Sequence, residues 1–279
     1  MTLPPQTPSR QRMVRANGLD LAVTEYAPPD RPVGDRPLVL LHGIGSRAVS
    51  WWPVADALAA RFRLYALDLR GHGASAKPTT GYLFPDYAAD LADLLDVLGI
   101  DSPLLLGHSL GGLIALQWAV DHPDAAAGIA LEDTALRTHP DILKAFDGWL
   151  ALNAMPLAHA AASYRAEYPD WTDDDCRRAA ESITAAAPAV FLELRTDSEA
   201  NLESGADRLA LLDVIRSPVL LIHGDLEAGS MVVPEDAARF AATVPKAQVE
   251  RVPGAGHSIH RYQTAAFLER VVPFLEEVG

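Results

Sequence analysis

The stretch Leu104–Leu116, with the sequence LLLGHSLGGLIAL, guides the interpretation of the whole chain. Its first leucines form a short apolar run of the kind found in strands that are buried on both faces. Glycine, histidine and serine then interrupt the run, after which it continues with the apolar content of a helix. A strand that turns sharply into a helix explains both halves, because Gly107 and Gly111 flank Ser109 where such a turn leaves little room for side chains.

Apolar runs of similar length recur along the chain and alternate with helical patterns such as Phe84–Leu98. Strands that alternate with helices are typical of parallel pairing through right-handed crossovers. We therefore predict an α/β fold with a doubly wound, mostly parallel sheet, preceded by an antiparallel hairpin that turns at Asn17-Gly18. The expected strands are the run PLVLLHG at 37–43, Phe62–Leu67, Pro103–Leu106, Ala127–Leu131, Pro218–Ile222 and Ala247–Val252.

The alternation stops between residues 134 and 212, where the sequence shows helical stretches rich in Ala, Leu, Trp and Arg but no convincing strand. The strand pattern resumes at Ser217-Pro218-Val219. We therefore predict a core of residues 13–133 and 213–279, interrupted by a helical cap of residues 134–212.

Composition limits the classes of partner and cofactor. A formal net charge of −14 opposes binding to nucleic acid, which needs clustered Lys and Arg. The single cysteine, Cys176, excludes an intramolecular disulfide and a cysteine-based metal site. The sequence shows neither a secretory signal nor an apolar run of about 18 residues, the length typical of a membrane helix. We expect a cytoplasmic monomer or homodimer that acts on a small molecule, with no metal, no cofactor and no membrane contact.

Ser109 is the candidate nucleophile, because Gly107 to Gly111 satisfies the pattern G-x-S-x-G between a buried strand and a helix. The turn places the serine at the N-terminus of that helix, where free N–H groups stabilise negative charge. The N–H groups of Leu110 and of Ile44, in the glycine loop after the earlier strand, are candidates for an oxyanion hole. His257, in the glycine-rich segment PGAGHSIH, is the candidate general base.

These motifs together resemble the α/β-hydrolase superfamily, in particular its capped esterases and lactonases. The matching segments are LLHGIGS at 40–46, DLRGHGAS at 68–75, GHSLGG at 107–112, HGD at 223–225 and GAGHSIH at 254–260. The resemblance covers residues 19 to 278 and implies that Ser109 is the nucleophile, His257 the base, and Ile44 and Leu110 the oxyanion donors.

The acid that orients His257 has three candidates. Glu132 ends a buried apolar run, where a charge is costly unless it is paired, for instance with the imidazole of His257. The resemblance places an acid after the strand that follows the cap, where Glu227 and, in another register, Asp225 are available. We favour Glu132, then Glu227, then Asp225.

Binding sites in open α/β sheets lie beyond the carboxyl ends of the strands, so an inserted cap is expected to cover the substrate pocket. Trp51 and Trp52 follow the oxyanion loop closely, and either of them could form a wall of the pocket. The cap contributes four further candidates for substrate contact, namely Trp149, Met155, Tyr164 and Trp171.

The predicted function is hydrolysis of a carboxylic ester or lactone with a mainly apolar body, through a Ser-His-acid triad and an acyl-enzyme. Carbon-carbon hydrolases, thioesterases and perhydrolases share the serine and are alternatives. A non-catalytic small-molecule receptor on the same fold is an alternative from a different class. Absence of turnover with retained ligand binding would indicate the receptor.

Overall fold

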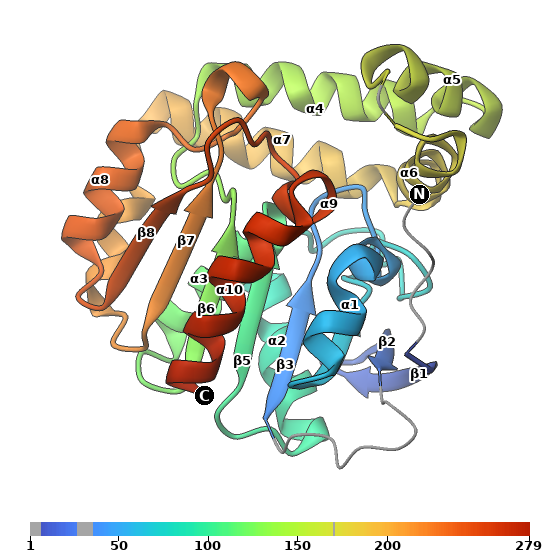
Figure 1. The fold of residues 1–279 in the computed structure, drawn as a ribbon. Helices are drawn as coiled ribbons and strands as arrows, with labels where there is room; N and C mark the ends of the chain where they lie inside the picture. Colours follow the sequence, from blue (N-terminus) through green and yellow to red (C-terminus); the bar gives the residue numbers. More distant parts are fainter. Residues whose placement is uncertain (1–6, 27–35, 170) are drawn as a thin grey trace.

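A computed structural model describes residues 7–26, 36–169 and 171–279 (Figure 1). Eight strands form one sheet in the order β1-β2-β4-β3-β5-β6-β7-β8. The first two strands pair antiparallel, β2 pairs antiparallel with β4, and all other pairs are parallel. The predicted mostly parallel, doubly wound sheet is confirmed. The strands are β1 (Ser9–Ala16), β2 (Leu19–Tyr26), β3 (Pro37–Leu41), β4 (Arg63–Leu67), β5 (Leu104–His108), β6 (Gly128–Glu132), β7 (Val219–His223) and β8 (Ala247–Arg251).

The predicted hairpin is present and begins at Ser9, earlier than the predicted core boundary at residue 13. Asn17 and Gly18 both have positive φ, at 45° and 70°, as a two-residue turn of this twist requires. The sequences of β3 and β5 are continuously apolar because both faces of the sheet are buried there. Val39 and Leu41 pack into one buried cluster and Leu38 and Leu40 into the other, so both faces of the sheet are covered.

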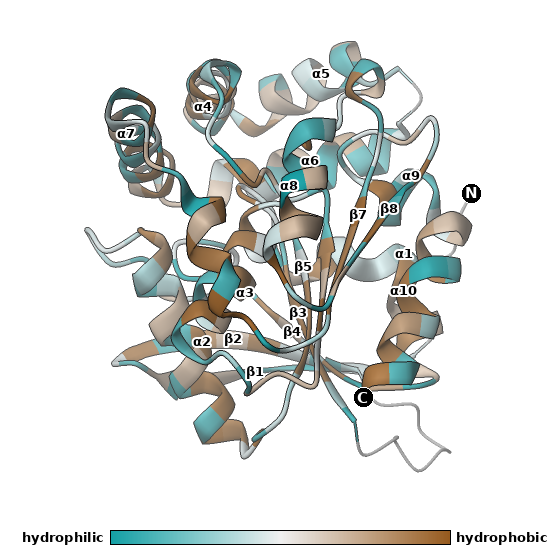
Figure 2. Cartoon of the chain, turned by 90° about the vertical axis from the view of Figure 1, so that its left-hand side faces the viewer, coloured by the Kyte–Doolittle hydropathy of each residue, from teal (hydrophilic) through white to brown (hydrophobic). Residues whose placement is uncertain are grey.

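Helices cover the two faces of the sheet, and brown apolar segments meet between them and the strands (Figure 2). One face packs against α1 (Trp52–Ala59), α9 (Ile259–Tyr262) and α10 (Thr264–Val278). The other face packs against α2 (Phe84–Leu98), α3 (Leu110–Asp121) and α8 (Pro234–Thr243). Short 3₁₀ segments, η1 (Ala48–Trp51), η2 (Arg208–Val214) and η3 (Leu226–Ala228), complete the connections.

Four helices lie between β6 and β7 in the chain, within the segment that we predicted as a cap. They are α4 (Pro140–Asn153), α5 (Leu157–Glu167), α6 (Asp173–Ala185) and α7 (Pro188–Ser204). Figure 1 shows them beyond the carboxyl ends of the central strands. Residues from this layer and from the core line a common cavity, so the insertion forms part of the candidate site.

Candidate active site

Ser109 occupies the turn between β5 and α3 in a strained backbone conformation, with φ 52° and ψ −114°. Its N–H donates to the carbonyl of Glu132 at 3.0 Å, and its carbonyl accepts from the N–H of Gly112 at 2.9 Å. The turn needs glycine at position 111, because a Cβ there would lie 2.0 Å from the carbonyl oxygen of Leu41. A strained backbone persists only where the surrounding structure holds it, and such residues cluster at functional sites. The strain at Ser109 therefore supports its choice as a candidate functional residue.

Two buried histidines hold the glycine loop that follows β3. The Nε2 atom of His42 accepts from the N–H of Leu69, and the Nε2 atom of His72 accepts from the N–H of Gly45, both at 3.1 Å. Their Nδ1 atoms face the carbonyls of Gly43 and Arg70 at 2.8 and 2.9 Å. These partners require neutral rings, with the proton on Nδ1.

Burial, the largest cause, lowers the pKa of His42 to about 4 and that of His72 to about 3. Both rings are therefore neutral at pH 7, and their Nε2 atoms keep accepting the backbone bonds that shape the loop.

The two candidate oxyanion donors, Ile44 and Leu110, line a cavity together with Ser109. Leu110 is the first residue of α3, so its N–H has no acceptor within the helix. Ile44 follows Gly43, where an added Cβ would lie only 3.4 Å from the Cβ of Ser109. The structure therefore brings these three residues to one cavity, as the oxyanion prediction requires.

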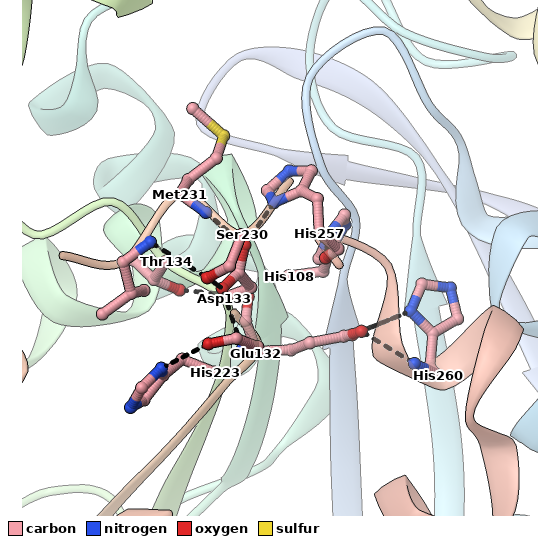
Figure 3. A network of polar contacts seen from close by, with 11 residues as sticks. His108, Glu132, Asp133, Thr134, His223, Ser230, Met231, His257 and His260 are labelled. Carbon is pink, nitrogen blue, oxygen red and sulfur yellow. Dashed lines mark hydrogen bonds and ion pairs between the residues drawn. The ribbon is translucent and has the colours of Figure 1, made fainter. Parts of the chain in front are cut away.

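His257 and Asp133 form a hydrogen-bonded pair (Figure 3). The Nδ1 atom of His257 lies 2.7 Å from Oδ2 of Asp133, whose side chain is fully buried. The carboxylate also accepts from the N–H of Met231 at 2.8 Å and from the hydroxyl of Ser230. His257 lines the same cavity as Ser109, so the histidine that pairs with Asp133 and the serine share one cavity.

The prediction that Glu132 orients His257 is wrong, because Glu132 pairs with a different histidine. Its carboxylate accepts from the N–H of His260 at 2.8 Å and meets Nδ1 of the same residue at 2.8 Å. Burial alone would raise the pKa of Glu132. The charges of His260 and His108 and the hydrogen bonds from His260 outweigh burial and lower the pKa to about 2. Figure 3 shows the two carboxylates turned to opposite sides, one to each histidine.

The two other candidate acids also lie away from His257. Asp225 forms an ion pair with Arg251 and accepts from the N–H of Gly254 at 2.8 Å. Glu227 is exposed on η3. Neither replaces Asp133 as the partner of His257.

The alternation of side chains between the two faces of the sheet along β6 could have shown that Glu132 faces away from the serine. Ala130, two residues earlier, packs into the cluster on the face covered by α9 and α10, and Glu132 lies on the same face. His260 stands on α9, on that face. Asp133 comes after the last residue of β6 and has a φ of 40°. Its side chain therefore does not follow the alternation of the strand and reaches His257 instead.

The six predicted pocket residues divide into two groups. Trp52, Trp149, Tyr164 and Trp171 line the cavity that contains Ser109 and His257. Trp51 is fully buried in the core, with its ring centroid 4.7 Å from that of His260, so the expectation that it forms a cavity wall is wrong. Met155 lies outside the lining of both cavities beside Ser109 and instead contacts the hydroxyl of Ser163.

The described residues include no group of three or more His, Cys, Asp or Glu side chains placed to hold a metal ion. Cys176 is buried and free. In the same part of the chain, no helix has both the length and the apolar character needed to cross a bilayer.

Comparison with known proteins shows the family to which the chain belongs. The model of the alpha/beta hydrolase fold family matches residues 36–262, and the chain belongs to that family. A relative of Caulobacter sp. (strain K31), named "Putative carbamate hydrolase RutD", is 32% identical over 255 residues, which are 88% of this chain and 92% of the relative. The 2-(acetamidomethylene)succinate hydrolase of Mesorhizobium japonicum is 29% identical, over 88% and 90% of the two chains.

Solved structures show the same architecture. The crystal structure of E-2-(acetamidomethylene)succinate hydrolase superimposes with a TM-score of 0.81 and 26% identity, over 96% of this chain and all of that one. The enol-lactonase of Burkholderia xenovorans LB400 has a TM-score of 0.76 and 23% identity, over 95% of this chain and all of that one, and shows the likeness of fold. The chain therefore has a hydrolase fold, with enzymes among its relatives.

Proposed function

We propose that the protein is a serine hydrolase that cleaves a small carboxylic ester or lactone, with Ser109 as nucleophile, His257 as general base and Asp133 as the acid. The observation that carries the proposal is the 2.7 Å contact between His257 and the buried Asp133, at a cavity that Ser109 shares. Asp133 keeps the Nδ1 proton in place, so Nε2 is the atom free to accept a proton from the serine.

The reaction proceeds in two halves. His257 takes the proton of Ser109 while the serine oxygen attacks the substrate carbonyl, and the N–H groups of Ile44 and Leu110 bind the resulting oxyanion. The imidazolium then protonates the leaving oxygen, the carbon-oxygen bond breaks, and an acyl-serine remains. Water attacks the acyl-serine with His257 as base, which releases the carboxylic acid and restores the serine.

Cleavage of a carbon-nitrogen acyl bond is a second candidate. The relatives with about 30% identity over most of the chain bear the names of a carbamate hydrolase and of an acetamido-compound hydrolase. The same triad serves both reactions, since only the atom that His257 protonates differs. Rates on an acetate ester and on the matching acetanilide distinguish the two, because the second candidate requires turnover of the anilide.

The test of the proposal is covalent labelling by a fluorophosphonate, read by intact mass. We expect one adduct on the wild-type chain and none on Ser109→Ala. Ser182→Ala is the matched control, since Ser182 lines the same cavity but stands inside a helix and donates to the carbonyl of Arg178. An adduct that persists on Ser109→Ala, or no adduct on the wild type, would contradict the proposal.

A further inference from the structure

Ser109 lies where two cavities meet. The first, of about 150 Å³, contains His257 together with Trp52, Tyr164 and Trp171. The second, of about 60 Å³, lies against Leu110 and carries mainly apolar side chains, among them Leu113, Leu136, Ile142, Phe146 and Met231. Ile44 and Trp149 line both cavities and form the boundary between them.

The position of His257 assigns the two halves of a substrate to the two cavities. The general acid must touch the leaving atom, and His257 lines the first cavity but not the second. The leaving group therefore extends into the first cavity, and the acyl chain occupies the second. The second cavity holds about four to six water-sized volumes, which matches a short acyl chain.

The first cavity has a basic lining, although the chain as a whole is acidic. Its lining includes Arg178 and Arg261, and no Asp or Glu is among the described residues that line it. Arg178 has a carboxylate partner, because its Nε atom pairs with Asp174 at 2.5 Å. Arg261 has no such partner, since no carboxylate of the described residues lies within ion-pair distance of it.

Arg261 is surrounded by aromatic side chains. Its guanidinium lies 5.2 Å from the ring centre of Trp171, and its Nε atom is buried without a hydrogen-bond partner among the described residues. Burial raises the pKa of the neighbouring Tyr164 and Tyr262, so both hydroxyls are neutral. The hydroxyl of Tyr262 hydrogen-bonds with the side chain of Arg261 but supplies no countercharge. A partly buried guanidinium without a carboxylate partner is costly, and a carboxylate relieves that cost through two parallel hydrogen bonds.

We propose that the leaving group of the substrate carries a carboxylate, which Arg261 binds in the cavity that His257 faces. The inference rests on the proposed serine hydrolase function. It makes Arg261 a specificity-determining residue and describes the substrate as a short acyl group joined to an anionic alcohol. A ring fits this space, since a cavity of about 150 Å³ accommodates benzene.

The test uses two esters that differ only in charge, 4-acetoxyphenylacetate and 4-acetoxyphenylacetamide. A methylene group separates the charged or neutral end from the ring, so the two phenol leaving groups have similar intrinsic reactivity. We expect the wild type to favour the carboxylate by about 10- to 100-fold in kcat/KM, the range of a charge-assisted bidentate contact. Arg261→Gln should reduce this ratio to about one, and Arg261→Lys should retain part of it.

The control variant is Arg195→Gln, because Arg195 lies on α7 in an ion pair with Asp147 and lines neither cavity. It should keep the wild-type ratio. Inhibition of the wild type by phenylacetate and phenylacetamide gives a second measurement that needs no variant, and the carboxylate should inhibit more strongly.

The outcomes separate this inference from the function on which it rests. Hydrolysis of both esters at equal kcat/KM, or an unchanged ratio in Arg261→Gln, would overturn the inference and leave the serine hydrolase standing. Labelling of Ser109 without hydrolysis of the carboxylate ester would likewise overturn the inference but not the serine hydrolase function. Absence of both labelling and ester hydrolysis in the wild type would overturn the proposed function and the inference together.

Discussion

Replacing Asp133 with asparagine removes the charge beside His257 while it keeps the shape of the side chain. The Oδ2 atom of Asp133 accepts from His257 and, at 2.8 Å, from the N–H of Met231. The Oδ1 atom accepts from the hydroxyl of Ser230 and, over a longer 3.4 Å, from the N–H of Gly224. An asparagine therefore places its oxygen at the Oδ2 position, because its NH₂ group there would oppose the N–H of Met231. The tautomer of His257 is preserved, and the lost feature is the negative charge.

The size of the effect follows from the burial of the pair. The imidazolium of His257 forms during the reaction against a fully buried partner, and removing one charge of a buried pair costs about 3–5 kcal/mol. Because the charge on His257 develops only toward the transition state, this cost appears in kcat. We expect kcat for the acetate ester to fall about 10²- to 10⁴-fold, with KM little changed.

The assay compares Asp133→Asn with Glu132→Gln in steady-state hydrolysis, in the rate of fluorophosphonate labelling and in thermal unfolding. Glu132→Gln should lose stability rather than catalysis, because Glu132 pairs with His260 and not with His257. Its rate per folded molecule should stay within about tenfold of the wild type, while its free energy of unfolding at neutral pH falls by about 3 kcal/mol. A larger catalytic loss in Glu132→Gln than in Asp133→Asn would refute the assignment of the acid.

Three further predictions concern stability and the pocket. The pKa of Glu132 is lowered to about 2, so its ionised form stabilises the fold at any pH above the ordinary pKa of a glutamate, and this stabilisation is lost as the pH falls toward 2. The difference in unfolding free energy between wild type and Glu132→Gln should therefore shrink between about pH 5 and 2. Burial also lowers the pKa of His72, to about 3, so between about pH 6.5 and 3 the folded state binds fewer protons than the unfolded state. In this range His72 should lower the free energy of unfolding by about 1.4 kcal/mol for each unit that the pH falls, and His72→Gln should reduce this pH dependence in urea titrations. Ile142→Ala should move the preferred acyl chain from acetyl toward longer esters, measured as kcat/KM across a chain-length series, because Ile142 lines the small second cavity; an unchanged profile would place the acyl chain elsewhere.

The sequence by itself determined the fold and the two residues at the centre of the candidate site. Apolar runs alternating with helical patterns are local features, and they defined the parallel sheet because strands buried on both faces must be apolar throughout. The glycines around Ser109 and before His257 marked sharp turns, and the requirement for small residues at such turns is also local. These signals depend on neighbours in the chain, so they can be read from it.

The tertiary structure decided the pairing of acids with histidines and the division of the pocket. Glu132 and Asp133 are adjacent in sequence, yet one faces His260 on α9 and the other faces His257, because the strand alternation ends between them. The same packing buried Trp51 in the core and left Trp52 in the cavity. It also left Arg261 without a carboxylate partner among the described residues. Contacts between residues more than a hundred positions apart depend on how the strands and the inserted helices come together, and the spacing of residues along the chain does not encode that arrangement directly.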